Sequence, residues 1–295
     1  MFNRAEKFYN EACKYRDKGE HELAFSMFLN AAQEGHLDAQ FSLAYSYNIG
    51  RGVAQDSVKA AEWYKKAANK GHVVAMNNLG LLYLNGQGVE QDYQKAYMWF
   101  EKAVSKNYFS ACANIGYCYE FGRYVAKDLT KAFENYKKAA DIGDDYAMNK
   151  LGHFYEEGKG VAHNKQLSFR WFEASAKNGN KDSQFKTARF YDLGYGVGQD
   201  YGKAIYWYEK AVAQGHDIAM NNLGFIYQYG KGTQVDLKKA FELYEKAANL
   251  NNMYACANLG YMYNDGVYVA KDFVTAYKWY LKGANLGNPN CMNMV

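Results

Sequence analysis

Residues 75–110 read AMNNLGLLYLNGQGVEQDYQKAYMWFEKAVSKNYFS, and this spacing of small, aromatic and acidic residues recurs along most of the 295-residue chain. An offset of 36 residues aligns the sequence with itself, without a gap, in seven repeats. These repeats are 39–74, 75–110, 111–146, 147–182, 183–218, 219–254 and 255–290. A period of this length indicates a solenoid, in which each supersecondary unit packs on its neighbours. We therefore expect one repeat array instead of the two globular domains that the length alone would suggest.

Each repeat is predicted to form two helices. In the first, Ala75, Leu79 and Tyr83 follow one another at helical spacing and form one apolar stripe. A glycine such as Gly86 would end this helix in the left-handed conformation. The second helix would begin after an N-capping Asp or Asn, at Asp56, Asp92, Asp128, Asn164, Asp200, Asp236 and Asp272. It would end at a residue that accepts the left-handed conformation, at Gly71, Asn107, Gly143, Gly179, Gly215, Asn251 and Gly287.

The shared pattern A-x-x-x-L-G-x-x-Y-x-x-G-x-G-V-x-x-D closely resembles the Sel-one-like repeat, a relative of the tetratricopeptide repeat with a longer glycine-bearing loop. The resemblance covers nearly the whole chain. It implies an all-α fold, a right-handed α/α superhelical solenoid of helix-turn-helix repeats. Tyr124 and Tyr268 depart from the pattern because they replace the second loop glycine. These two substitutions leave the local shape of their loops open.

Both ends of the chain depart from the repeat. Residues 1–38 contain Ala24, Phe28 and Ala31 at the spacing of a second helix but lack the glycine loop. They resemble an N-terminal capping helix pair of the tetratricopeptide kind. Residues 291–295 supply only the start of a truncated C-terminal helix, which would leave the last full repeat partly uncovered. The chain would then be a fragment of a longer protein or would self-associate through its C-terminal end.

A longer period of 144 residues, or four repeats, lies within the short one. The second and sixth repeats share the string AMNNLG, and the third and seventh share ACAN and YVAKD. We infer that a block of four repeats was duplicated in tandem. The duplication is either ancestry alone or the source of two similar binding stretches.

The candidate partner-binding residues lie on the first helices, which by resemblance to tetratricopeptide proteins would line the concave groove. One set occupies the repeat position directly after the Leu-Gly pair of the shared pattern: Tyr45, Leu81, Tyr117, His153, Arg189, Phe225 and Tyr261. The other set lies two residues before the Leu and includes Asn77, Asn149 and Asn221. Aromatic side chains supply rigid contact area, and Asn can both donate and accept hydrogen bonds. Bridging between neighbouring helices is an equal alternative for each Asn.

Charged residues accompany this face in the fourth and fifth repeats. Lys150, Lys186 and Arg189 form a basic stretch, and Glu156 and Asp192 lie about a turn further along the same helices. Such a pattern would favour a charged partner segment. A solvated charged face is the commoner explanation of such a pattern.

The sequence predicts no catalytic residue, no metal site and no cofactor. The five cysteines are scattered without a C-x-x-C pair, which argues against both zinc and a disulfide framework. His36, His72 and His216 recur only because the repeat recurs, and no nucleophile or phosphate-binding motif is present. No secretory signal and no membrane-spanning stretch is seen, so we expect a cytoplasmic chain without membrane insertion. Export by a route that needs no signal stays open.

The resemblance implies a protein–protein interaction scaffold or adaptor that binds a partner peptide or protein, with roles in bacterial signalling, regulation or virulence. A cell-wall or β-lactam-directed hydrolase, as proposed for cysteine-rich relatives, is one alternative, but this chain lacks their paired cysteines. An RNA-binding helical repeat is another. The net charge of +4 is only mildly basic, which argues against nucleic acid as the partner. Arginine, the residue preferred for bidentate contacts with phosphate, is also scarce.

Overall fold

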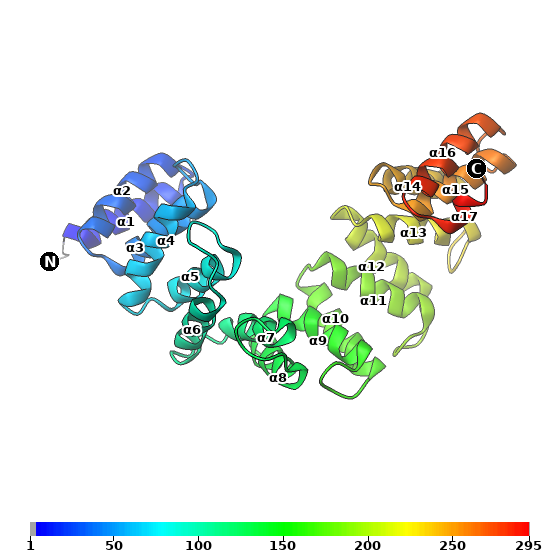
Figure 1. The fold of residues 1–295 in the computed structure, drawn as a ribbon. Coiled ribbons are helices and arrows are strands. Elements are labelled where there is room, and N and C mark those ends of the chain that lie inside the picture. Colours follow the sequence, from blue (N-terminus) through cyan, green and yellow to red (C-terminus); the bar gives the residue numbers. More distant parts are fainter. Residues whose placement is uncertain (1–3, 295) are drawn as a thin grey trace. The chain divides into compact units, whose positions relative to one another are not determined.

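The computed structural model describes residues 4–294, which form α-helices and contain no strand (Figure 1). The helices of the N-terminal half are α1 (Arg4–Asp17), α2 (His21–Gln33), α3 (Leu37–Ile49), α4 (Ser57–Asn69), α5 (Val73–Asn85), α6 (Tyr93–Val104), α7 (Ala111–Phe121) and α8 (Leu129–Ala140). Those that follow are α9 (Asp145–Glu157), α10 (Lys165–Lys177), α11 (Lys181–Leu193), α12 (Tyr201–Ala213), α13 (Asp217–Tyr229), α14 (Leu237–Asn249), α15 (Met253–Asp265), α16 (Phe273–Asn285) and α17 (Pro289–Met292). The predicted all-α repeat fold is confirmed.

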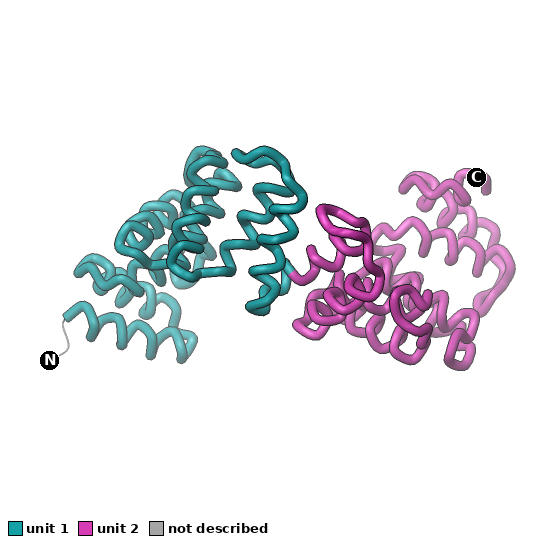
Figure 2. The backbone as a smooth tube through the Cα atoms, turned by 90° about the horizontal axis from the view of Figure 1, so that it is seen from below, with its two compact units in different colours: residues 1–147 teal, residues 148–295 magenta. Residues whose placement is uncertain are grey.

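The chain divides into two compact units, Met1–Ala147 and Met148–Val295 (Figure 2). Within each unit, the two helices of a repeat pack on each other most extensively, and the second helix then packs on the first helix of the next repeat. Each unit therefore has the sequential packing of a solenoid, in which a repeat contacts only its neighbours.

The helix caps lie where the sequence predicts them. The carboxylate of Asp92 accepts a hydrogen bond of 2.9 Å from the backbone N–H of Lys95 and begins α6. The corresponding Asp or Asn caps the second helix in each of the six remaining repeats. Gly86 ends α5 with φ of +67°, and Asn107 and Asn251 take the left-handed conformation with φ of +65° and +64°. These short-range signals thus set the boundaries of the second helices.

Adjacent repeats approach each other closely at the second loop glycine. A Cβ on Gly88 would collide with the backbone carbonyl of Ser57, at the start of the preceding repeat's second helix. Tyr124 and Tyr268 occupy the same loop position and keep the left-handed conformation, with φ of +66° and +69°. The ring of Tyr124 packs 5.6 Å from that of Tyr97. The loop therefore keeps its backbone conformation at both departures from the pattern.

In nearly all repeats, the second of the two helices contributes one large ring to the core. Tyr64, Tyr136, Tyr208 and Tyr244 are fully buried. Glycines of the first helices make room for these rings, since a Cβ on Gly224 would lie 2.8 Å from the ring of Tyr244. Each hydroxyl has a hydrogen-bond partner, such as Gln228 at 2.7 Å from that of Tyr244. These four tyrosines are thus core residues with a hydrogen-bonded hydroxyl.

Candidate functional site

Histidines begin several of the first helices, and this role is not anticipated by the sequence analysis. The imidazole Nδ1 atoms of His36, His72 and His216 accept hydrogen bonds of 3.1–3.2 Å from the backbone N–H groups of Ala39, Ala75 and Ala219. Asn180 and Asn252 cap α11 and α15 from the same repeat position. Since Asn is a common N-cap, its alternation with His at one repeat position is the signal that could have revealed the caps.

The same histidines join consecutive repeats. The ring of His216 stacks 4.5 Å from that of Phe185, and the ring of His72 stacks 4.4 Å from that of Phe41. Burial lowers the pKa of both histidines, although a nearby carboxylate opposes this shift. They are therefore neutral at pH 7, which leaves Nδ1 free to accept the capping hydrogen bond.

The asparagines of the candidate set link neighbouring first helices. The amide oxygen of Asn221 accepts a hydrogen bond of 2.9 Å from Asn258, and that of Asn77 accepts one of 2.8 Å from Asn114. The amide of Asn149 donates to the hydroxyl of Ser183 at 2.7 Å. All three therefore have a structural role between repeats, which was one of the two interpretations left open by the sequence.

A groove of about 510 Å³ lies on the first-helix face of the second compact unit. We call it the α13 groove, because α13 supplies its centre while α11 and α15 supply its two sides. Its apolar and aromatic lining comprises Phe185, Leu193, Ile218, Phe225, Tyr254 and Ala257. Its polar lining comprises Arg189, Asp192, Asn221, Asn222, Lys231, Asn258, Asn288 and Asn290.

The α13 groove combines exposed aromatic rings with cationic side chains. Phe225 is 40% exposed and Tyr254 is 52% exposed, so aromatic area is available for contact. The ammonium of Lys231 lies 4.8 Å from the ring centre of Phe225, and the guanidinium of Arg189 lies 5.9 Å from that of Phe185. Among residues 4–294, neither cation has a carboxylate within 4.0 Å.

The structure brings three of the ten candidate residues, Arg189, Asn221 and Phe225, into this groove. Tyr261 is 41% exposed on α15 and lies outside the lining, and Tyr45 lines a different cavity in the first compact unit. The remaining five line neither cavity: Asn77 is buried, and Leu81, Tyr117, Asn149 and His153 are half-buried.

Several lining residues were missed by the sequence analysis, among them Ile218, Tyr254 and Lys231. Ile218 precedes Asn221 by three positions, and Tyr254 precedes Ala257 by the same interval, so helical spacing could have identified both. Lys231 comes from the loop after α13, and no periodic pattern places a loop side chain beside a helix face.

Much of the charge pattern predicted in the fourth and fifth repeats is neutralised internally. The carboxylate of Glu156 accepts hydrogen bonds from Lys186 at 2.8 Å and lies 3.5 Å from Nδ1 of His153. Burial acts to raise the pKa of Glu156, but these two partners outweigh it and lower the pKa to about 2. His153 also packs edge-on against Phe172, with ring centres 4.9 Å apart. Of the three basic residues of this stretch, Arg189 is the one that lines the α13 groove.

Within the described part of the chain, no group of three or more His, Cys, Asp or Glu side chains is arranged to hold a metal ion. Burial raises the pKa of the thiols of Cys112, Cys256 and Cys291, and it raises that of Cys118 to about 12. Thiols of this kind carry little thiolate at pH 7 and are poor nucleophiles. A search of residues 4–294 finds no helix with the length and apolar character that crossing a membrane requires.

Comparisons with solved structures identify two similar bacterial proteins. One is a protective antigen of uropathogenic Escherichia coli strains that displays an SLR fold, with 34% identity, a TM-score of 0.86 and coverage of 98% of this chain. This chain spans 63% of the antigen's length. The other is a Sel1 repeat protein from Oxalobacter formigenes, with 31% identity, a TM-score of 0.69, and coverage of 92% of this chain and 78% of that protein. No curated protein matches the sequence.

The family model of the Sel1 repeat matches residues 37–72, 73–108, 109–144, 145–180, 181–216, 217–252 and 254–288. It places each repeat boundary two residues before the one chosen from the sequence, except that the last match begins at residue 254. The Sel1 repeat is generally a non-catalytic scaffold for protein interactions. With seven matched repeats, this chain belongs to the Sel1 repeat family.

Proposed function

We propose that this chain is a non-catalytic interaction scaffold that binds a segment of a partner protein in the α13 groove. One observation carries the proposal: Arg189, Asn221 and Phe225, selected by their repeat position alone, line the same 510 Å³ groove. That volume lies within the range of about 300–1,000 Å³ that is typical of ligand sites. The proposal concerns binding, and it assigns no reaction to the chain.

The chemistry of the groove supports a peptide as its occupant. Phe225 and Tyr254 offer rigid aromatic area, which is the commonest source of binding energy at protein interfaces. Lys231 lies beside the ring of Phe225 and Arg189 beside that of Phe185, and neither has a carboxylate partner among the described residues. An acidic side chain of the partner would form an ion pair with either cation. The amides of Asn221 and Asn222 hydrogen-bond to each other at 3.3 Å, so they shape the floor more than they select the ligand.

The test is a selection of displayed random peptides on the immobilised full chain, followed by affinity measurements. The groove variant is Arg189→Ala/Phe225→Ala. The matched control, Leu81→Ala/Tyr117→Ala, changes the same helix position in two repeats of the first compact unit. We expect selected peptides to bind the groove variant at least about tenfold more weakly than the native chain and to bind the control normally. Equal losses in both folded variants, or no selected peptide at all, would contradict the proposal.

The setting of this function is also part of the proposal. The two similar proteins come from bacteria, and one of them is described as a protective antigen of uropathogenic strains. Together with the groove, this supports an adaptor role in bacterial signalling, regulation or virulence. Deletion of the gene in the source organism, with the Arg189→Ala/Phe225→Ala variant as the complementing copy, tests whether the groove is needed for that role.

We further propose self-association through α16, which is one of the two alternatives that the sequence leaves open for the C-terminal end. Tyr277 is 48% exposed, whereas Tyr97 and Phe169, at the same repeat position, are 8% and 9% exposed. Tyr97 is covered because Tyr119 and Tyr124 of the next repeat pack on it, with ring centres 6.1 Å and 5.6 Å away. Sedimentation at high protein concentration should show a dimer that Tyr277→Glu abolishes. A strict monomer would overturn this part of the proposal.

A further inference from the structure

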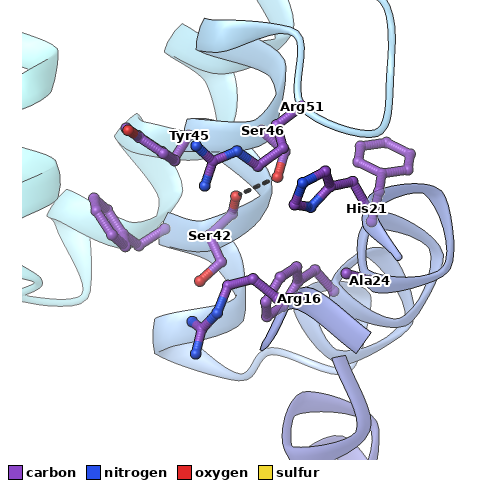
Figure 3. Close-up of a pocket in the computed structure, with 10 residues that line it drawn as sticks. Arg16, His21, Ala24, Ser42, Tyr45, Ser46 and Arg51 are labelled. Carbon is purple, nitrogen blue, oxygen red and sulfur yellow. Dashed lines mark hydrogen bonds between the residues drawn. The ribbon is translucent and has the colours of Figure 1, made fainter. Parts of the chain in front are cut away.

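A second cavity, independent of the α13 groove, lies at the N-terminal end of the first compact unit (Figure 3). It has a volume of about 260 Å³ and is lined by the end of α1, the first half of α2, the helix α3 and the loop after α3. We call it the cap pocket. Its aromatic lining is Phe25, Phe28, Phe41 and Tyr45, and its cationic lining includes Arg16 and Arg51.

The cap pocket has a clear origin in the sequence. The linker between α1 and α2 consists of residues 18–20, whereas residues 50–56 join the helices α3 and α4 of the next pair. In inner repeats the longer loop places a valine against the core, as Val89 and Val125 do. The short linker supplies no such side chain, so the joint between α1, α2 and α3 is left unfilled.

The aromatic lining is held in place by its own packing. Phe28 is 3% exposed and packs 5.9 Å from the ring of Tyr9, and Phe25 packs edge-on against Tyr47 at 5.2 Å. The ring of Phe41 stacks between His72 at 4.4 Å and Tyr45 at 6.3 Å. The cavity is smaller than the roughly 300 Å³ at which sites for drug-sized ligands begin. Its size and lining suit one aromatic side chain of a partner. That side chain would pack edge-on or face-on against the aromatic rings of the lining.

The rim of the cap pocket is cationic. The guanidinium of Arg51 lies 5.8 Å from the ring centre of Tyr45, and within residues 4–294 no carboxylate lies within 4.0 Å of it. Among the described residues, the carboxylate within 4.0 Å of the Arg16 guanidinium is that of its neighbour Asp17, at 3.0 Å, and this exposed pair contributes little to stability. Figure 3 shows Arg16, His21 and Arg51 around the pocket. A carboxylate beside the bound ring would pair with Arg51.

We infer that the cap pocket binds an aromatic side chain of a partner segment that carries an acidic residue next to it. The aromatic ring occupies the cavity, and the carboxylate pairs with Arg51 at the rim. This site gives the chain a second point of attachment, on the compact unit that does not contain the α13 groove.

The test uses four labelled probes with the full chain: a capped peptide with a central Trp-Glu, the same peptide with Trp-Lys, the same peptide with Ala-Glu, and indole-3-acetate. We expect the Trp-Glu peptide to bind at least about tenfold more tightly than each of the other three. The Arg51→Ala variant should remove the preference for Trp-Glu over Trp-Lys and leave the fold intact, because Arg51 is exposed.

Two further measurements keep the inference independent of the proposed function. Ser42→Leu would place a larger side chain at the half-buried wall of the pocket and should abolish binding of the Trp-Glu peptide, whereas Arg189→Ala/Phe225→Ala should leave it unchanged. The inference is overturned if Trp-Lys binds as well as Trp-Glu, or if the Arg189→Ala/Phe225→Ala variant loses the peptide. Equal affinity for indole-3-acetate would show a small-molecule site in place of a docking pocket.

Discussion

The second and sixth repeats share the string AMNNLG but differ in the surface that surrounds it. On α5, Asn77 is 9% exposed, and on α13, Asn221 lines a 510 Å³ groove. Both asparagines accept a hydrogen bond from the next repeat, at 2.8 Å and 2.9 Å. The shared string therefore builds the same link between helices in both repeats, and only one of the two copies belongs to the candidate site.

The neighbouring residues account for the difference. Repeat two has Leu81 where repeat six has Phe225, and Gln87 where repeat six has Lys231. Ser110 directly precedes α7, at the repeat position that Tyr254 occupies in α15. The α13 groove thus combines ordinary repeat architecture with Phe225, Lys231 and Tyr254, whose matching positions in the first compact unit carry no aromatic or cationic side chain. A duplicated repeat can keep its fold and gain or lose a binding surface through a few exposed positions.

The largest expected effect comes from the close approach of the second loop glycine, which both repeats share. Gly88→Ala and Gly232→Ala each combine a positive φ, +68° and +66°, with a collision, against Ser57 and Tyr201 respectively. We expect each to lower the free energy of unfolding by about 2–4 kcal/mol, measured by chemical denaturation. Only Gly232→Ala should also weaken peptide binding at the α13 groove, because Lys231 is its neighbour.

Gly215→Ala serves as the control for these two variants. Gly215 has φ of +77°, but a Cβ added there meets no atom within 4 Å. The cost should therefore be about 1 kcal/mol, from backbone strain alone. If Gly215→Ala is as costly as Gly88→Ala, the close approach between repeats contributes nothing to stability.

Exchanging the exposed residues of the two repeats tests directly whether these residues account for the difference in binding. Phe225→Leu/Lys231→Gln gives repeat six the residues of repeat two and should weaken peptide binding by about tenfold. Its stability should change by less than about 0.5 kcal/mol, since both side chains lie at the surface. The reverse exchange, Leu81→Phe/Gln87→Lys, should create no new binding because the flanking repeats differ. A gain of affinity in that variant would show that two positions are enough to make the site.

The hydrogen bonds that Asn77 and Asn221 accept should also differ in their contribution to stability. Asn77→Ala leaves the amide of Asn114 without its acceptor at a buried position, and we expect a loss of about 1–2 kcal/mol in the free energy of unfolding. Asn221→Ala should cost less, because water in the groove can replace the missing acceptor for Asn258. Denaturation of both variants in the same buffer tests this order, and the opposite order would contradict it.

The smallest effect concerns the histidine caps, which the two repeats also share. Burial lowers the pKa of His72 and His216, so the folded chain favours the neutral imidazole. Stability should be constant above about pH 6.5, the ordinary pKa of histidine, and fall as the pH drops below it toward the lowered values. His72→Asn/His216→Asn should flatten this dependence, because Asn180 and Asn252 cap α11 and α15 in the same way. An unchanged pH profile in the folded variant would contradict the role of the caps.

Several features of the candidate site follow from particular residues of the sequence, and several do not. The choice of Arg189 and Phe225 follows from their repeat position, which comes after the Leu-Gly pair of the shared pattern and lies beside the buried stripe of each first helix. The same rule also selected Leu81 and Tyr117, which line neither cavity. Helical periodicity gives the face of a side chain, but burial on that face depends on what the adjoining repeats place next to it.

The sequence by itself determined the repeat, the helix pairs and their caps, because these depend on contacts within a few residues. An Asp bonds to a backbone N–H three positions ahead, and a glycine reaches the left-handed conformation without help from distant residues. Only the tertiary structure decided which cations have a carboxylate partner among residues 4–294, as Lys186 does and Arg189 does not. It also decided where cavities remain, since the α13 groove and the cap pocket form where side chains of separate helices meet. Such sites depend on packing between repeats, and a repeat pattern does not encode that packing locally.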